Sequence, residues 1–216
     1  MTAKEIQGVD ASKRMAKESE TGSRSLSGRV GRFVTCIAIF MSLFQLYTGF
    51  AGDLPGSKQL SIHLTFALVL CFLCFPGSKK SPRHRIAISD IILAIFAGAS
   101  ALYLFANYEH VVTSVGDAAA YDLVIGAVLL VLVLEATRRS ISPILPIITL
   151  IFLVYAYLGP YCPEVLAHRG FTVKRIIDHI FMSGEGLWGV PLRVSATFVF
   201  LFVLFCAFLE RTGAGE

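Results

Sequence analysis

Two groups of side chains in this 216-residue chain have spacings that could support catalysis or metal binding. His179 and Ser183 lie four positions apart, so a helix would place them on one face, as a general base and a nucleophile are placed in hydrolysis. Both residues fall in a polar connection, and no third group follows that would orient the histidine. We therefore do not expect a serine hydrolase.

Cys71 and Cys74 have the spacing of a redox or metal-binding pair. They lie in an apolar run without a second pair or a companion histidine, so we interpret them as small hydrophobic side chains that fill space. Only His63 lies near an apolar run, which argues against haem ligation, and no glycine-rich nucleotide loop is present. The sequence predicts no enzyme, no catalytic residue, no metal site and no cofactor.

A charged group follows the apolar run 123–134. Glu135, Arg138 and Arg139 are spaced i, i+3 and i+4, which predicts a local ion pair on one helix face. A contact with another subunit or with anionic lipid headgroups is the alternative, and the spacing leaves both open. Together with Trp188, where interfacial tryptophans are expected, and Arg193, these are the residues to which we assign a role in topology or at an interface.

The composition indicates a membrane protein. Hydrophobic residues make up 55% of the chain and charged residues 16%, against about 25% charged residues in soluble domains. The apolar residues are gathered in blocks, and a backbone in lipid must satisfy its own hydrogen bonds in helices. No basic stripe with interleaved aromatic residues suggests nucleic acid as a partner. We predict an all-α polytopic membrane protein.

Apolar runs of about the length that crosses a bilayer divide the chain. They predict about six transmembrane helices, at residues 30–50, 60–75, 86–106, 121–136, 141–158 and 190–209. The prolines lie at helix starts, so no span is broken at its centre, and the bundle is expected to be a rigid scaffold without a site of its own. The ionisable residues of the spans lie near span ends, where we expect them to stay hydrated: Asp90, Asp122, Glu135, Arg193 and Glu210.

Two segments outside the spans have distinct patterns. Residues 1–29 are polar and predict a disordered tail. In the connection after Gly159, apolar residues recur at helical spacing opposite Lys174, Arg175 and Asp178; they are Val173, Ile176, Ile177, Ile180 and Phe181. This pattern predicts a short helix that either lies at the membrane interface or packs on the bundle.

The distribution of basic residues predicts the orientation. If both termini are cytoplasmic, most of the Lys and Arg residues fall in the inner segments, including the pair Arg138 and Arg139. The outer segments then hold only Lys58, Arg169, Lys174, Arg175 and Arg193. We expect a multi-pass protein of the bacterial inner membrane with a cytoplasmic amino terminus.

Several motifs resemble a known family. The motifs are Glu135-Ala-Thr-Arg-Arg, Tyr155-Ala-Tyr-Leu-Gly-Pro-Tyr-Cys-Pro163, Ala167-His-Arg-Gly170, Gly186-Leu-Trp-Gly-Val-Pro-Leu-Arg-Val-Ser-Ala-Thr-Phe198 and Phe205-Cys-Ala-Phe-Leu-Glu-Arg-Thr-Gly-Ala-Gly215. They are similar to fused permease subunits of tripartite ATP-independent periplasmic (TRAP) transporters, of the branch served by TAXI-type binding proteins. Residues 120–216 carry the similarity, while the earlier spans match in layout the small four-helix subunit.

The resemblance implies a domain organisation and a function. Residues 30–139 would be a scaffold like the small subunit, 140–189 a connecting transmembrane helix with a periplasmic interfacial segment, and 190–216 the truncated first helix of the transport domain. The function would be that of a secondary transporter of organic acids, sodium-coupled in its complete form. The implied partners are a periplasmic binding protein, the remaining large permease domain and membrane lipids. The family's substrate and sodium sites would lie beyond this chain, so no binding residue is assigned. A stand-alone membrane assembly protein without transport activity is the alternative.

Overall fold

The protein is described by a computed structural model over residues 23–24, 26, 28–52, 54, 57–77, 86–163 and 165–213. Most of the predicted tail 1–29 and residues 78–85 of the basic loop lie outside the described residues. Within the described part of the chain every regular element is helical. The predicted all-α architecture is confirmed.

The helices follow one another as α2 (Gly28–Ala51), α3 (Lys58–Cys74), α4 (Ile88–Ala106), α5 (Tyr108–Thr113), α6 (Ala120–Ser140), α7 (Ile144–Leu158), α8 (Val173–Met182), α9 (Val190–Val194) and α10 (Phe200–Thr212). A 3₁₀ turn (Gly159–Tyr161) extends α7, and a π-helical turn (Ser195–Val199) joins α9 to α10. Five of the resulting rods are long and apolar enough to cross a membrane, and α3, with 17 residues, is a shorter apolar helix. The chain is therefore a polytopic membrane protein, as the apolar runs predict.

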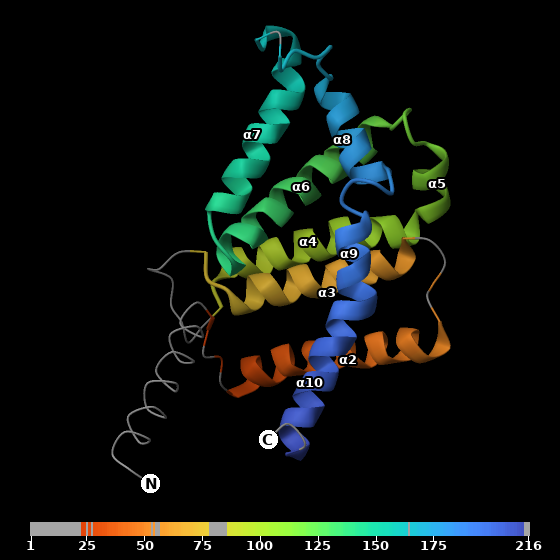
Figure 1. Cartoon of the computed structure of the whole chain (residues 1–216). Coiled ribbons are helices and arrows are strands. Elements are labelled where there is room, and N and C mark those ends of the chain that lie inside the picture. Colours follow the sequence, from red (N-terminus) through yellow and green to blue (C-terminus); the bar gives the residue numbers. More distant parts are fainter. Residues whose placement is uncertain are drawn as a thin grey trace.

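The tightest packing joins α3 and α4. Ala97 and Ala101 of α4 and Phe72 of α3 are fully buried. The hydroxyl of Ser61 donates to the carbonyl oxygen of Ala101 at 2.5 Å. Small side chains let two helices approach closely, so van der Waals contact and a hydrogen bond across the interface hold the pair together in lipid. Figure 1 shows α2, α3 and α4 lying beside one another, with α6 running obliquely above α4 in this view.

The second packing unit is formed by α6 and α8. A Cβ placed on Gly126 of α6 would lie 2.8 Å from the Cβ of Phe181, so only glycine leaves room for this ring. Phe181 and Asp178 of α8 are both buried. Of the two interpretations of the amphipathic segment, the structure favours the helix packed on the bundle. The single backbone N–H of Gly116 donates to both carboxylate oxygens of Asp178, at 3.2 and 3.1 Å, so this polar side chain also faces the bundle.

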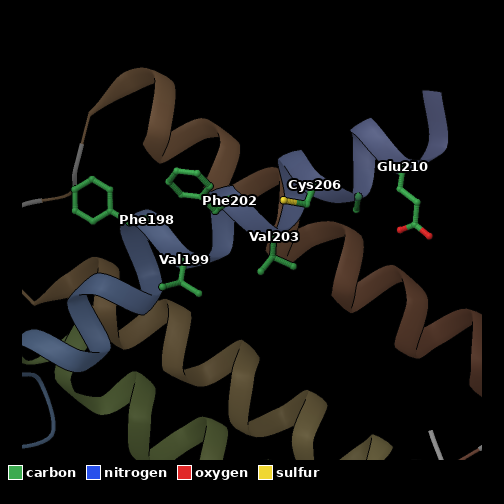
Figure 2. A pocket seen from close by; sticks show the side chains of 7 residues that line it. Phe198, Val199, Phe202, Val203, Cys206 and Glu210 are labelled. Carbon is green, nitrogen blue, oxygen red and sulfur yellow. The ribbon is translucent and has the colours of Figure 1, made fainter. Parts of the chain in front are cut away.

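The last rod, formed by α9, the π-helical turn and α10, crosses α3 and α2 in the view of Figure 1. Only Ala196 is buried along it. Figure 2 shows one exposed face of this rod, a groove lined by Phe198, Val199, Phe202, Val203, Cys206, Ala207 and Glu210. Its apolar surface is typical of a helix that faces lipid or other apolar helices.

Candidate functional site

The predicted ion pair forms in the last turns of α6. Nε and Nη2 of Arg138 donate to the two carboxylate oxygens of Glu135, each at 2.7 Å, and Nε of Arg139 donates to Glu135 Oε1 at 2.7 Å. Arg138 is 44% exposed, whereas Arg139 is 6% exposed. The local interpretation of this spacing is confirmed. An exposed pair of this kind contributes only a few tenths of a kcal/mol, so the buried arginine is the more informative partner.

Arg139 also forms an ion pair with a second carboxylate inside the bundle, that of Asp90. Its Nη1 donates to Oδ1 of Asp90 at 2.8 Å, and the other carboxylate oxygen of Asp90 pairs with Arg24. The guanidinium of Arg139 also lies over the ring of Phe72, 5.0 Å from its centroid. We call Arg24, Asp90, Glu135, Arg138 and Arg139 the arginine cluster. It links the segment before α2 to α4 and α6.

The arginine cluster also neutralises a helix end. Nη1 of Arg24 donates to the carbonyl oxygens of Phe72 and Leu73 at 3.4 and 3.1 Å, and its backbone N–H donates to that of Cys74 at 2.7 Å. These carbonyls belong to the last turn of α3, which has no intrahelical donors for them and carries a partial negative charge. The guanidinium of Arg24 donates hydrogen bonds to these carbonyl oxygens and offsets the partial negative charge of the helix end. Three guanidinium groups share two carboxylates, so the cluster carries a net positive charge.

The prediction that Asp90 stays hydrated at a span end is wrong. Asp90 is 2% exposed, because Arg24 and Arg139 cover its carboxylate from both sides. Arg24 belongs to the segment for which we predicted a disordered tail, and it is buried as well. A buried charge needs a partner of opposite sign close by. The sequence could show that Asp90 lies near an end but not that two arginines meet it there.

A second buried carboxylate lies at the opposite end of α4, a helix about 28 Å long. The hydroxyl of Tyr103 donates to Oδ1 of Asp122 at 2.6 Å, and Nε2 of His110 lies 3.1 Å from Oδ2. The backbone N–H of Ala119 also donates to Oδ2, at 3.2 Å. Asp122 is fully buried, so the prediction of a hydrated carboxylate is wrong here too. Its place in the first turn of α6 lets it satisfy the free N–H of that helix end.

Comparison with known families gives a match to the carboxy-terminal part of the chain. Residues 128–216 match the family model described as the DctM component of the tripartite ATP-independent periplasmic transporters. The match supports a TRAP permease. No curated protein and no solved structure matches the chain. DctM components are transporter permeases rather than enzymes, and they normally work with a periplasmic binding protein and a small membrane component.

The arginine cluster crosses the boundary of the DctM match. Glu135, Arg138 and Arg139 lie inside the matched segment, whereas Asp90 and Arg24 lie before it. The buried ion pairs therefore connect the TRAP-like segment to the helices that precede it. Both carboxylate oxygens of Asp90 are paired and buried, so we interpret these contacts as a structural connection.

A further polar network, which the sequence analysis missed, joins the TRAP-like segment to α2 and α3. Nδ1 of His63 lies 2.5 Å from Nε2 of Gln45, and its Nε2 lies 3.5 Å from the hydroxyl of Ser195 in the π-helical turn. Thr48 donates to Gln45 Oε1 at 3.4 Å and accepts from Gln59 at 3.3 Å. The signal in the sequence was the occurrence of these five polar residues inside or beside apolar runs, where polar side chains are costly unless paired.

Trp188 does not lie where we expected it. It is 1% exposed, and its Nε1 donates to the carbonyl oxygen of Phe181 at 2.5 Å. The prediction of an interfacial tryptophan facing the membrane surface is wrong, because the turn after α8 folds this ring back onto Phe181. Arg193 is exposed in α9, and its guanidinium has no partner among the described residues. The structure therefore does not bring the five predicted residues into one site.

The remaining candidates form no reactive arrangement in the described part of the chain. The hydroxyl of Ser183 donates to the backbone carbonyl of His179 at 2.5 Å, so the ring of that histidine is not its partner. Cys71 donates to the carbonyl oxygen of Ala136 at 3.5 Å, and both Cys71 and Cys74 are free thiols. No group of three metal-ligating side chains occurs among the described residues.

Proposed function

We propose that the chain is the membrane component of a TRAP-type secondary transporter. The observation that carries this proposal is the DctM match over residues 128–216, which begins within α6 and includes α7 to α10. The helix in which the match begins, Ala120–Ser140, and two segments inside the match, Ile144–Tyr161 and Val190–Thr212, are long and apolar enough to cross a membrane, as a permease requires.

We further propose the substrate class, the driving ion and the location. The substrate is an organic acid, delivered by a periplasmic binding protein of the TAXI type, and transport is coupled to sodium. The motifs at residues 155–163 and 186–198 support this branch of the family. The excess of Lys and Arg on one set of loops supports a bacterial inner-membrane protein with both termini in the cytoplasm.

Within that transporter we propose that the described bundle is a scaffold. The arginine cluster fixes α3, α4 and α6 at one end, and the Asp122 contacts fix α4 and α6 at the other. The loss of one partner from a buried ion pair strongly destabilises a protein. The contacts at the two ends therefore hold the helices in one arrangement. In the proposed transporter, this rigid helix bundle stays fixed while the transport domain moves against it.

The proposal is tested by uptake in the native bacterium. An in-frame deletion of the coding segment for residues 23–213 should abolish sodium-dependent uptake of at least one radiolabelled organic acid in a panel of mono- and dicarboxylates, and the full chain supplied in frame should restore it. Unchanged uptake across the panel contradicts a transport role and favours the stand-alone assembly protein. The purified full chain in liposomes should show no uptake under a sodium gradient. Uptake in the liposomes would contradict the scaffold role but not the role in transport.

A further inference from the structure

A groove of about 380 Å³ lies between α7 and α8. Leu153 and Ala156 of α7 form one wall, and Ile176 and Ile180 of α8 form the other. The two helices meet near the turn that joins them and then diverge, as Figure 1 shows. The contact between α7 and α8 is therefore limited, and apolar side chains of both helices face a space that the described residues do not fill.

Basic side chains are concentrated on the rim of this groove. Arg175 and His179 line it, and their spacing of i, i+4 places them on the same face of α8. The guanidinium of Arg169 lies over the ring of Phe171, which also lines the groove, 5.4 Å from its centroid. These basic residues belong to the segment that the charge distribution places outside the cytoplasm, where few basic residues are expected.

No acid in the described residues neutralises this rim. The side chains of Arg175 and His179 have no ion-pair or hydrogen-bond partner there, and both residues are exposed. The nearest carboxylate along α8, that of Asp178, is buried and accepts from the backbone N–H of Gly116, and it forms no ion pair with Arg175 or His179 in the described structure. The rim is therefore free to bind an anion.

The apolar surface continues on the other side of the α7–α8 contact. A second groove there is lined by Leu130, Leu150, Leu153, Val154, Tyr157, Leu158, Val173, Ile176 and Ile177. It shares Leu153 and Ile176 with the first groove and contains no charged side chain. An apolar cleft beside a membrane-spanning helix is filled by hydrocarbon, because water gains no hydrogen bonds there.

From this arrangement we infer that the groove between α7 and α8 binds an anionic phospholipid. One acyl chain lies between Leu153, Ala156 and Ile180, and the phosphate accepts hydrogen bonds from Arg175 and His179. Charge-assisted bonds to phosphate are the strong class of hydrogen bond, and arginine suits phosphate geometry. A small hydrophilic anion would meet the same two basic groups but would leave the apolar walls uncovered. The groove thus selects an amphipathic anion.

The test is a titration of the purified full chain in detergent micelles with phosphatidylglycerol, with bound lipid counted by native mass spectrometry. The double variant Arg175→Gln/His179→Gln should bind phosphatidylglycerol about tenfold more weakly than the unsubstituted chain. Binding of phosphatidylcholine should not change. Lys174→Gln is the matched control, because the substitution removes one positive charge from the same helix and Lys174 does not line the groove. It should leave phosphatidylglycerol binding within about twofold.

A second variant tests the apolar wall without changing charge. Ala156→Phe places a ring in the groove and should also weaken phosphatidylglycerol binding, while the fluorescence of Trp188 reports that the fold is kept. If Lys174→Gln loses as much phosphatidylglycerol binding as the double variant, the proposal is overturned. The lipid would then be attracted by the positive charge of the surface in general. Full binding by the double variant or by Ala156→Phe overturns it as well. Equally tight binding of soluble glycerol 3-phosphate overturns the assignment to a lipid.

Discussion

Arg139 and Asp90 are 49 positions apart in the chain, and their side chains form a buried ion pair, with Nη1 and Oδ1 2.8 Å apart. Asp90 lies in the first turn of α4 and Arg139 in the last turn of α6, so the pair fixes the two helices at one end of the bundle. Arg24 approaches the same carboxylate from the segment before α2. One carboxylate therefore decides how three parts of the chain meet.

Replacing Asp90 tests this dependence. Asp90→Asn keeps the size of the side chain but leaves Arg24 and Arg139 buried with one negative partner fewer. Breaking a buried ion pair in this way costs about 3–5 kcal/mol, so the midpoint of denaturant unfolding in detergent micelles should fall markedly. Glu210→Gln is the control, because Glu210 is exposed and has no ion pair in the described structure. A loss for Asp90→Asn below about 1 kcal/mol would show that the pair has no role in stability.

Tyr103 should matter because it donates to a buried carboxylate. Tyr103→Phe removes the 2.6 Å hydrogen bond to Asp122 and leaves His110 and a backbone N–H as the remaining donors. A lost hydrogen bond to a charged group costs about 1.5–3 kcal/mol. The same unfolding measurement on Tyr157→Phe should show little change, since Tyr157 is 53% exposed and its hydroxyl makes no hydrogen bond in the described structure. Equal effects of the two substitutions would contradict the assigned contact.

Gly126 sets the distance between α6 and α8. Gly126→Ala places a methyl group 2.8 Å from Cβ and Cγ of Phe181, and overpacking of this kind costs about 1–3 kcal/mol. Phe181 packs on Trp188, the single tryptophan of the chain, with ring centroids 6.2 Å apart. We expect a red shift of tryptophan emission as Trp188 loses its buried environment. Gly184→Ala, where a Cβ meets nothing within 4 Å, should leave the emission unchanged.

The orientation of the bundle can be tested with single cysteines. In a variant whose five native cysteines are replaced by serine, Ser140→Cys lies beside the arginine cluster and Asp117→Cys lies at the opposite end. A membrane-impermeant maleimide added to intact cells, after the outer membrane is made permeable, should label Asp117→Cys and spare Ser140→Cys. Lysed cells should label both. The reverse pattern in intact cells would place the arginines outside the cytoplasm and contradict the proposed topology.

Local patterns in the sequence were reliable where the interacting residues are close along the chain. The apolar runs predict the long helices that the structure contains, although not the short α5, and α8 begins at Val173, where the amphipathic pattern begins. The i, i+3 and i+4 spacing of Glu135, Arg138 and Arg139 gives the observed ion pairs. Helical geometry alone fixes these relations. The domain boundaries and the TAXI-type branch stay predictions.

The long-range contacts were not predictable in the same way. Asp90 and Asp122 each lie near a helix end, which suggested hydrated side chains, yet both are buried, as is Asp178 within α8. Their long-range partners are Arg24 and Arg139, Tyr103 and Gly116, which lie between 19 and 66 positions away. The position of a residue along a span describes its depth but not which neighbours cover it.

The sequence by itself determined that the chain is helical and embedded in a membrane, because the cost of unpaired backbone groups in lipid allows apolar runs of this length little else. It also determined the ion pairs within α6, since both partners share one helix face. Only the tertiary structure decided that Asp90 is enclosed by two arginines and that Trp188 folds onto Phe181. Those contacts depend on how separate helices pack, and packing is set by the shapes of side chains such as Ala97 and Gly126 rather than by hydrophobicity along the chain.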